Sequence, residues 1–229
     1  MSPLLGGSTA ATGRPLVALS DPQRRITYQA AALLLGYPDA DLLSRLPVVR
    51  RGVAELPAGV ADPLLRLTDY LAAGAPTALA TQYVGTFDLQ RRCCLYLTYY
   101  AHGDTRKRGM ALLAFSHAYR AAGLELAADE LPDHLAVVLE FAATGDLAVA
   151  DRLLSGHRAG LELLLLALRE AGSPYADAVG PVSATLPALR GTDREAVLAL
   201  AREGPPAEEV GLDPYSQPFE PPTVPTGRR

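Results

Sequence analysis

The chain has 229 residues, of which 49% are hydrophobic and 20% charged, a balance that suits one compact domain with a substantial core. Its formal net charge of −4 gives no electrostatic reason to expect a nucleic-acid partner. The two cysteines, Cys93 and Cys94, are adjacent, which excludes a disulfide framework and predicts a reducing compartment.

Neither a signal peptide nor a membrane span is evident. Residues 1–19 lack a basic region followed by a sustained apolar run. The most apolar stretch, 161–168, contains Glu162 and is far shorter than the ~20 residues that a spanning helix requires. We therefore expect a soluble cytoplasmic protein with no direct membrane insertion.

The two ends differ in composition from the middle. Residues 1–20 are rich in glycine, serine, threonine and proline, and residues 204–229 contain seven prolines. Such segments bury little apolar surface, so both are expected to be disordered tails. The predicted folded domain is 21–203.

Helical signals follow one another through that domain. Asp21 before Pro22 predicts a capped start, and Gly36 with Pro38 predicts the first helix end. Asp88 and Asp146 are expected to cap later helices. The predicted helices after the first are 39–55, 61–73, 76–86, 89–102, 105–122, 132–144, 147–155, 157–171, 175–186 and one from residue 192 or 193 to 203. No β-alternation bounded by hairpin turns is evident, so the class is all-α, a single globular bundle of about ten helices.

No strong catalytic motif is present. Cys93 and Cys94 with His102 suit zinc by ligand type, yet adjacent helical residues point about 100° apart and no second cluster completes the site. The alternative is that one cysteine packs in the core and the other lies near it.

Basic residues fall where a helix begins. Arg106, Lys107 and Arg108 lie in a predicted first turn, where the helix dipole disfavours cations, and Arg91 and Arg92 repeat the conflict one helix earlier. Tertiary partners or a ligand would resolve it; simple solvation is the alternative.

An acidic segment precedes the predicted helix 132–144. Glu130, Asp133 and His134 have the chemistry of an acid/base or metal site. The alternative is a hinge between helices, with a charge pattern that suits a helix start.

These segments together resemble a known family. Residues 83–106, YVGTFDLQRRCCLYLTYYAHGDTR, closely resemble the NarJ-type assembly chaperones of respiratory nitrate reductase, within the wider group of TorD and DmsD chaperones. The match continues through RGMALL (108–113), ELPDHL (130–135) and VLEF (138–141), and AALLLGYP (31–38) also fits. The resemblance covers about 24–200, and the 83–141 block is its specific part.

The resemblance implies an all-helical, TorD-like cytoplasmic chaperone and not an enzyme. Its partner would be the immature catalytic subunit of respiratory nitrate reductase, including the N-terminal segment of that subunit. It would keep the client competent for insertion of the molybdenum cofactor and of an iron–sulfur cluster before membrane docking. It would bind no cofactor stably and would leave the finished enzyme.

In related chaperones an acidic-Pro-Asp-His segment lies in a hinge that is important for client-peptide binding, and Glu130, Pro132, Asp133 and His134 match it here. Carboxylates would suit the basic residues of the peptide, and tyrosines would add apolar area, although at least one tyrosine is expected in the core. The arginine cluster would repel a cationic peptide and is assigned to another client surface or to internal pairing. The predicted client-binding set is Tyr96, Tyr99, Tyr100, His102, Asp104, Arg106, Arg108, Glu130, Leu131, Pro132, Asp133, His134 and Glu140.

Two other hypotheses remain open at this point. One is a helical metal-dependent hydrolase or nucleotide-binding protein that uses Glu130, Asp133 and His134. The other is a generic adaptor that binds a different helix in a groove of the bundle.

Overall fold

The computed structural model describes residues 15–103, 105–127 and 130–189, together with 191, 195 and 197–199. The helices whose bounds are defined within these residues are ten α-helices and one short 3-10 helix, η1. Their bounds are α1 Asp21–Leu34, α2 Ala40–Val53, α3 Ala58–Ala73, α4 Pro76–Phe87, η1 Arg91–Cys93, α5 Leu97–His102, α6 Arg106–Ala121, α7 Leu135–Thr144, α8 Leu147–Gly156, α9 Arg158–Glu170 and α10 Ala176–Thr185. The predicted all-α bundle is confirmed.

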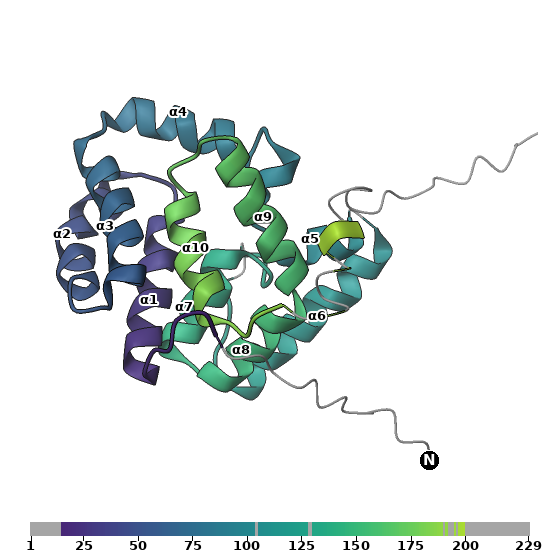
Figure 1. Ribbon diagram of the computed structural model, residues 1–229. Coiled ribbons are helices and arrows are strands. Elements are labelled where there is room, and N and C mark those ends of the chain that lie inside the picture. The colour runs from purple at the N-terminus through teal and green to yellow at the C-terminus, as the bar shows by residue number, and fades with distance from the viewer. Residues whose placement is uncertain are drawn as a thin grey trace, which may run out of the picture.

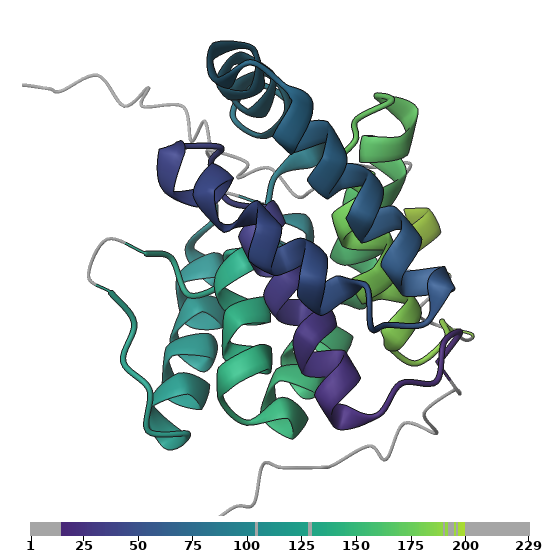
Figure 2. The ribbon, with the colours of Figure 1, turned by 90° about the vertical axis from the view of Figure 1, so that its left-hand side faces the viewer.

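Helix α1 lies at the centre of the bundle. It packs against α7 on one side and α10 on the other, while α2 and α3 cover it from outside (Figures 1 and 2). The Arg25 guanidinium donates to the carbonyls of Ala143 and Gly145 at 2.8 and 3.0 Å. Because those carbonyls end α7, this side chain satisfies acceptors that the helix leaves open and fixes α7 against α1.

Local caps define several helix starts. Asp39 and Asp146 accept the backbone N–H of Leu42 and Val149, so the expected cap at Asp146 is confirmed. The first helix differs from expectation: its N-cap is Ser20, which forms a capping box with Gln23, and Asp21 is the first helical residue.

The folded part begins before residue 21. Val17 donates its backbone N–H to the Ala184 carbonyl at 3.1 Å, and Val17 and Leu19 pack against the core. Backbone pairing with the end of α10 therefore holds the segment that directly precedes α1, inside the range 1–20 predicted as a tail. Residues 1–14 and 204–229 lie outside the described residues.

The predicted helix 89–102 is wrong. Asp88 ends α4 instead of capping the next helix, η1 follows, and residues 94–96 are extended before α5 begins at Leu97. The extended segment pairs with residues from the start of α7: Leu97 donates to the Asp133 carbonyl at 3.0 Å and Leu135 donates to the Leu95 carbonyl at 2.8 Å. We call this paired region, 94–98 with 133–135, the clasp.

The clasp also shortens the predicted helix 132–144. Pro132 and Asp133 lie in a turn, His134 pairs with Tyr96 in an isolated antiparallel bridge, and α7 begins only at Leu135. Of the expected last helix, residues 195 and 197–199 are described and helical.

Helix length and hydropathy also bear on membranes. Searched over the described residues, the chain has no helix that combines the length and apolar character needed to cross a bilayer.

Candidate functional site

Two adjoining hollows form a groove beside α7. The first has a volume of about 320 Å³ and the second about 310 Å³. Glu130, Val137 and Glu140 line both, so the two hollows meet along the outer face of α7. We call the combined surface the α7 groove.

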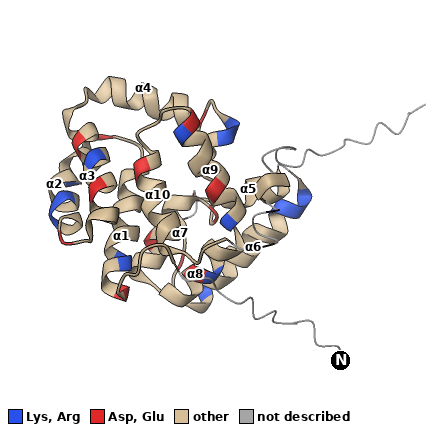
Figure 3. Cartoon of the chain, viewed as in Figure 1, with Lys and Arg blue, Asp and Glu red and all other residues tan. Residues whose placement is uncertain are grey.

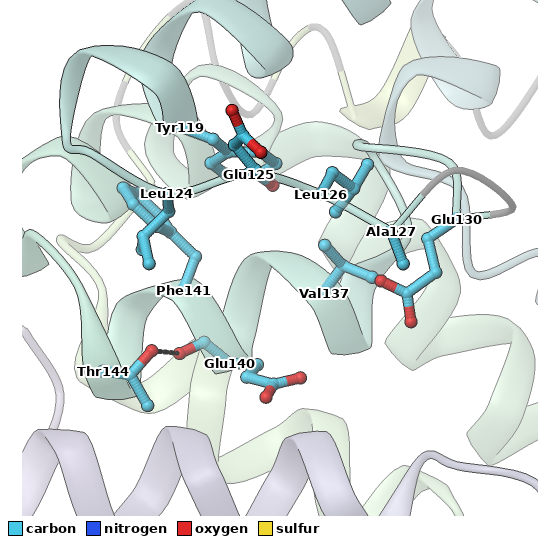
Figure 4. Close-up of a pocket in the computed structure, with 10 residues that line it drawn as sticks. All are labelled: Tyr119, Leu124, Glu125, Leu126, Ala127, Glu130, Val137, Glu140, Phe141 and Thr144. Carbon is cyan, nitrogen blue, oxygen red and sulfur yellow. Dashed lines mark hydrogen bonds between the residues drawn. The ribbon is translucent and has the colours of Figure 1, made fainter.

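The first hollow lies between α7 and the segment that leads from α6 to it. Leu126 and Val137 approach each other across it, and Leu124 lies near Phe141 (Figure 4). Tyr119 lines the wall and donates its hydroxyl to the Pro132 carbonyl at 2.6 Å. This bond ties the end of α6 to the residue that directly precedes the clasp segment 133–135, and so holds the wall in place.

The second hollow lies between α7 and the end of α1. Leu33 and Tyr37 form its far wall, and His134 and Ala136 form the near wall. Arg45 reaches its rim from α2, where it pairs with Asp41 at 2.7 Å. This wall therefore adds apolar area to the groove, and the carboxylate of Asp41 neutralises the cation at its rim.

Carboxylates dominate the charge of the groove. Glu125, Glu130 and Glu140 line it and all three are exposed to solvent. Apolar walls with carboxylates at the edge suit an amphipathic helix that carries lysine or arginine. Of the predicted client-binding residues, Glu130, His134 and Glu140 line this groove, and the exposed Leu131 lies next to Glu130 in the chain.

Asp133 does not face the groove. Its side chain is 0% exposed and accepts hydrogen bonds from the Thr98 backbone N–H at 3.1 Å and from the Thr98 hydroxyl at 2.5 Å. Thr98 is the second residue of α5, and the N-cap residue Tyr96 supplies no side-chain cap. Asp133 therefore caps α5 from a distance of 35 residues in sequence, and Pro132 is buried next to it.

Arg108 lies on the other side of the same carboxylate. Its guanidinium is 3.9 Å from the Asp133 carboxylate, 3.3 Å from the Thr98 hydroxyl, and over the Tyr96 ring at 5.3 Å. This placement favours internal pairing for Arg108, one of the two assignments left open by the sequence. Arg106 is exposed, and Asp104 lies outside the described residues.

His134 contributes to both the clasp and the groove. Its ring meets the Tyr96 ring edge to face, with centroids 5.3 Å apart. Burial lowers the pKa of His134, and the charge of Asp133 partly offsets that effect. The imidazole is therefore held largely neutral near pH 7, as an apolar wall requires.

The α5 residues serve the core. Tyr100 is buried and donates to the carbonyls of Arg92 and Cys94, both at 2.9 Å, and burial raises the pKa of its hydroxyl. Tyr99 is buried beside it, which confirms that at least one tyrosine packs in the core. Tyr99, Tyr100 and the half-buried His102 line neither hollow of the groove.

Sequence reasoning missed most of the apolar wall. The missed lining residues include Leu124, Glu125, Leu126, Val137, Phe141 and, from α1, Leu33. Val137, Phe141 and Thr144 recur with Glu140 at helical spacing, which was an available signal. The α1 wall has no signal in the local sequence.

The cysteines show the simpler of the two expected arrangements: Cys93 is buried in the core and Cys94 is half-buried. In the part of the chain that the structure describes, no three His, Cys, Asp or Glu side chains are arranged to hold a metal ion.

A solved structure places this architecture in a known class of fold. A protein of Archaeoglobus fulgidus, described as a redox enzyme maturation protein, aligns with a TM-score of 0.50 and 23% identity over 77% of this chain and 93% of its own. The two chains therefore share an all-α fold.

Sequence comparisons identify the family. The nitrate reductase delta subunit model matches residues 53–179. The Bacillus subtilis NarJ, described as a nitrate reductase molybdenum cofactor assembly chaperone, is 31% identical over 73% of this chain and 92% of its own. The Escherichia coli K12 NarJ is 34% identical over 62% of each chain. This chain therefore belongs to the nitrate reductase delta subunit family, whose NarJ-type members are assembly chaperones and not enzymes.

A longer relative contains a similar region. The nitrate reductase-like protein NarX of Mycobacterium tuberculosis H37Rv is 43% identical over 70% of this chain, which spans about a quarter of the length of NarX.

Proposed function

We propose that this protein is a cytoplasmic chaperone that binds the N-terminal segment of the immature catalytic subunit of respiratory nitrate reductase. The α7 groove would receive that segment as an amphipathic helix. Its apolar face would lie on Val137, Phe141 and Leu33, and its basic residues would meet Glu130 and Glu140. The observation that carries the proposal is the acidic rim on an apolar groove, in a chain of this family.

The same proposal assigns distinct roles to exposed and to buried residues of the predicted client-binding set. Glu130, Leu131 and Glu140 are exposed and would contact the client, with His134 in the groove wall. Asp133 and Tyr100 are buried and would act by positioning the clasp and α5. Neither would touch the peptide.

Binding of the client's N-terminal segment would serve assembly of the enzyme. A client held in this way would stay competent for molybdenum cofactor insertion, and its docking to the membrane anchor would wait until insertion is complete. The chaperone would bind no cofactor stably and would be absent from the mature enzyme. We expect docking to come after insertion because an N-terminal segment bound in the groove cannot contact a second partner at the same time.

Calorimetric titration tests the groove directly. The ligand is a synthetic peptide with the N-terminal sequence of the nitrate reductase catalytic subunit from the same genome. We expect saturable binding to the full chain, and a loss of about tenfold or more in affinity for the double variant Glu130→Lys/Glu140→Lys, since two favourable charge contacts become repulsive. Glu55→Lys is the matched control, because Glu55 is also exposed but does not line the groove.

The charge reversal also predicts a salt effect. Wild-type affinity should fall as ionic strength rises, because rim charges exposed to water are screened. Tight binding that neither the double variant nor 0.5 M salt weakens would place the client on another surface.

A further inference from the structure

Helix α6 presents an uncovered apolar face at the edge of the bundle. It packs mainly on α5, and Phe115 and Tyr119 are its buried residues. On the opposite side, Met110 is 71% exposed and Leu113 is 47% exposed. Ala114 and His117 follow at spacings of three and four residues, so these side chains form one stripe along the helix.

The charged residues that α6 itself carries beside this stripe have one sign. Within its 16 residues α6 contains no aspartate or glutamate. Exposed Lys107 lies next to Met110 on the helix surface, and exposed Arg120 lies next to His117. Basic residues, coloured blue on the ribbon, mark the start of α6 at the right-hand edge of the molecule (Figure 3). The face therefore suits an acidic segment with large apolar residues.

The chain itself carries such a segment. Residues 205–220, PPAEEVGLDPYSQPFE, contain four acidic residues and no lysine or arginine. Val210, Leu212, Tyr215 and Phe219 are interspersed among them. Residue 220 follows residue 199 by 21 residues. An extended chain of 21 residues reaches about 70 Å, whereas a folded unit of this size is about 40 Å across.

We propose that residues 205–220 dock on the exposed face of α6 and cover Met110 and Leu113. Glu208 and Glu209 pair with the cations that flank the stripe, and the aromatic residues cover its centre. Covalent attachment gives the segment an effective concentration of about 1 mM, so even weak contacts suffice for substantial occupancy. This surface is separate from the α7 groove, and the inference does not depend on the proposed client.

Met110 provides the test, because the chain contains only two methionines, Met1 and Met110. The rate at which hydrogen peroxide converts Met110 to its sulfoxide is measured by mass spectrometry in the full chain. In the variant Glu208→Lys/Glu209→Lys, Met110 should oxidise about four- to tenfold faster than in the wild type, because the segment covers Met110 most of the time only in the wild type. In 1 M salt the wild type should approach the rate of this variant.

Charge exchange distinguishes docking from a general effect of charge. Lys107→Glu/Arg120→Glu should also speed the oxidation of Met110. A variant that combines these two substitutions with Glu208→Lys/Glu209→Lys should restore protection, because the charges are then complementary again. Arg51→Glu, a reversal at an exposed position of α2, should leave the rate unchanged.

Three results would overturn the inference. The first is equal oxidation rates in the wild type and the Glu208→Lys/Glu209→Lys variant. The second is an Arg51→Glu effect as large as that of the α6 variant. The third is protection of Met110 that increases with protein concentration, which would assign the α6 face to a second copy of the chain.

Discussion

Replacement of Asp133 by alanine should destabilise the fold strongly without removing any client contact. The carboxylate is 0% exposed and accepts hydrogen bonds from the Thr98 backbone N–H at 3.1 Å and from the Thr98 hydroxyl at 2.5 Å. Alanine leaves a buried backbone N–H of α5 without its acceptor and removes a carboxylate that lies 3.9 Å from the Arg108 guanidinium. The perturbation therefore affects the start of α5 and the clasp.

The size of the effect follows from these contacts. A hydrogen bond to a buried charged group contributes about 1.5–3 kcal/mol, and removal of one partner of a buried pair costs about 3–5 kcal/mol. The terms overlap, so we expect a loss of about 3–5 kcal/mol in the free energy of unfolding. Asp133→Asn keeps an acceptor for the Thr98 N–H and should lose about 1–2 kcal/mol.

Urea unfolding followed by circular dichroism measures these changes. Asp62→Ala on the exposed side of α3 is the matched control and should stay within about 0.5 kcal/mol of the wild type. Asp133→Asn should also keep wild-type affinity for the client peptide. The reasoning fails if Asp133→Ala costs less than about 1 kcal/mol, or if a stably folded Asp133→Asn binds the peptide tenfold more weakly.

Four further substitutions test the packing of the core and the titration of a buried histidine. Gly160→Ala would place a Cβ 2.9 Å from the Tyr100 Cβ and should cost about 1–3 kcal/mol by urea unfolding, whereas Gly85→Ala meets nothing within 4 Å and should stabilise α4 by about 0.5–1 kcal/mol. Tyr100→Phe removes a hydroxyl bonded to two backbone carbonyls and should lower stability by about 1–2 kcal/mol in thermal unfolding; an unchanged Tm would contradict the bonding. Burial lowers the pKa of His157, so the unfolded state binds the proton more tightly, and stability should fall as pH drops below about 6.5. The wild type should lose up to about 1.4 kcal/mol per pH unit more than His157→Gln in that range, and parallel curves would refute the assignment.

Local signals were sufficient for most of the helices. A helix start depends on side chains within three or four residues, so Asp146 could be recognised as the cap of α8 from the sequence. The same short range explains the error at α1, where Ser20 and Asp21 are both good caps and the capping box with Gln23 decides between them.

The candidate site likewise has a part that local sequence predicts and a part that it does not. Glu130 and Glu140 could be proposed as client contacts from their chemistry, and both line the α7 groove. No local pattern separates Glu130 from Asp133, three residues further along. Only the packing of α5 against that segment shows that one carboxylate is exposed and the other caps a distant helix.

The sequence alone therefore determined the class, the order of most helices and the acidic character of the site, because periodicity, caps and charge are local properties. The tertiary structure decided where residues 94–96 leave the helical conformation, because their backbone groups pair with residues 133–135. It also decided the second wall of the groove, which comes from α1, about 100 residues earlier in the chain. Such long-range contacts depend on how helix faces pack, and no spacing within one segment encodes that packing.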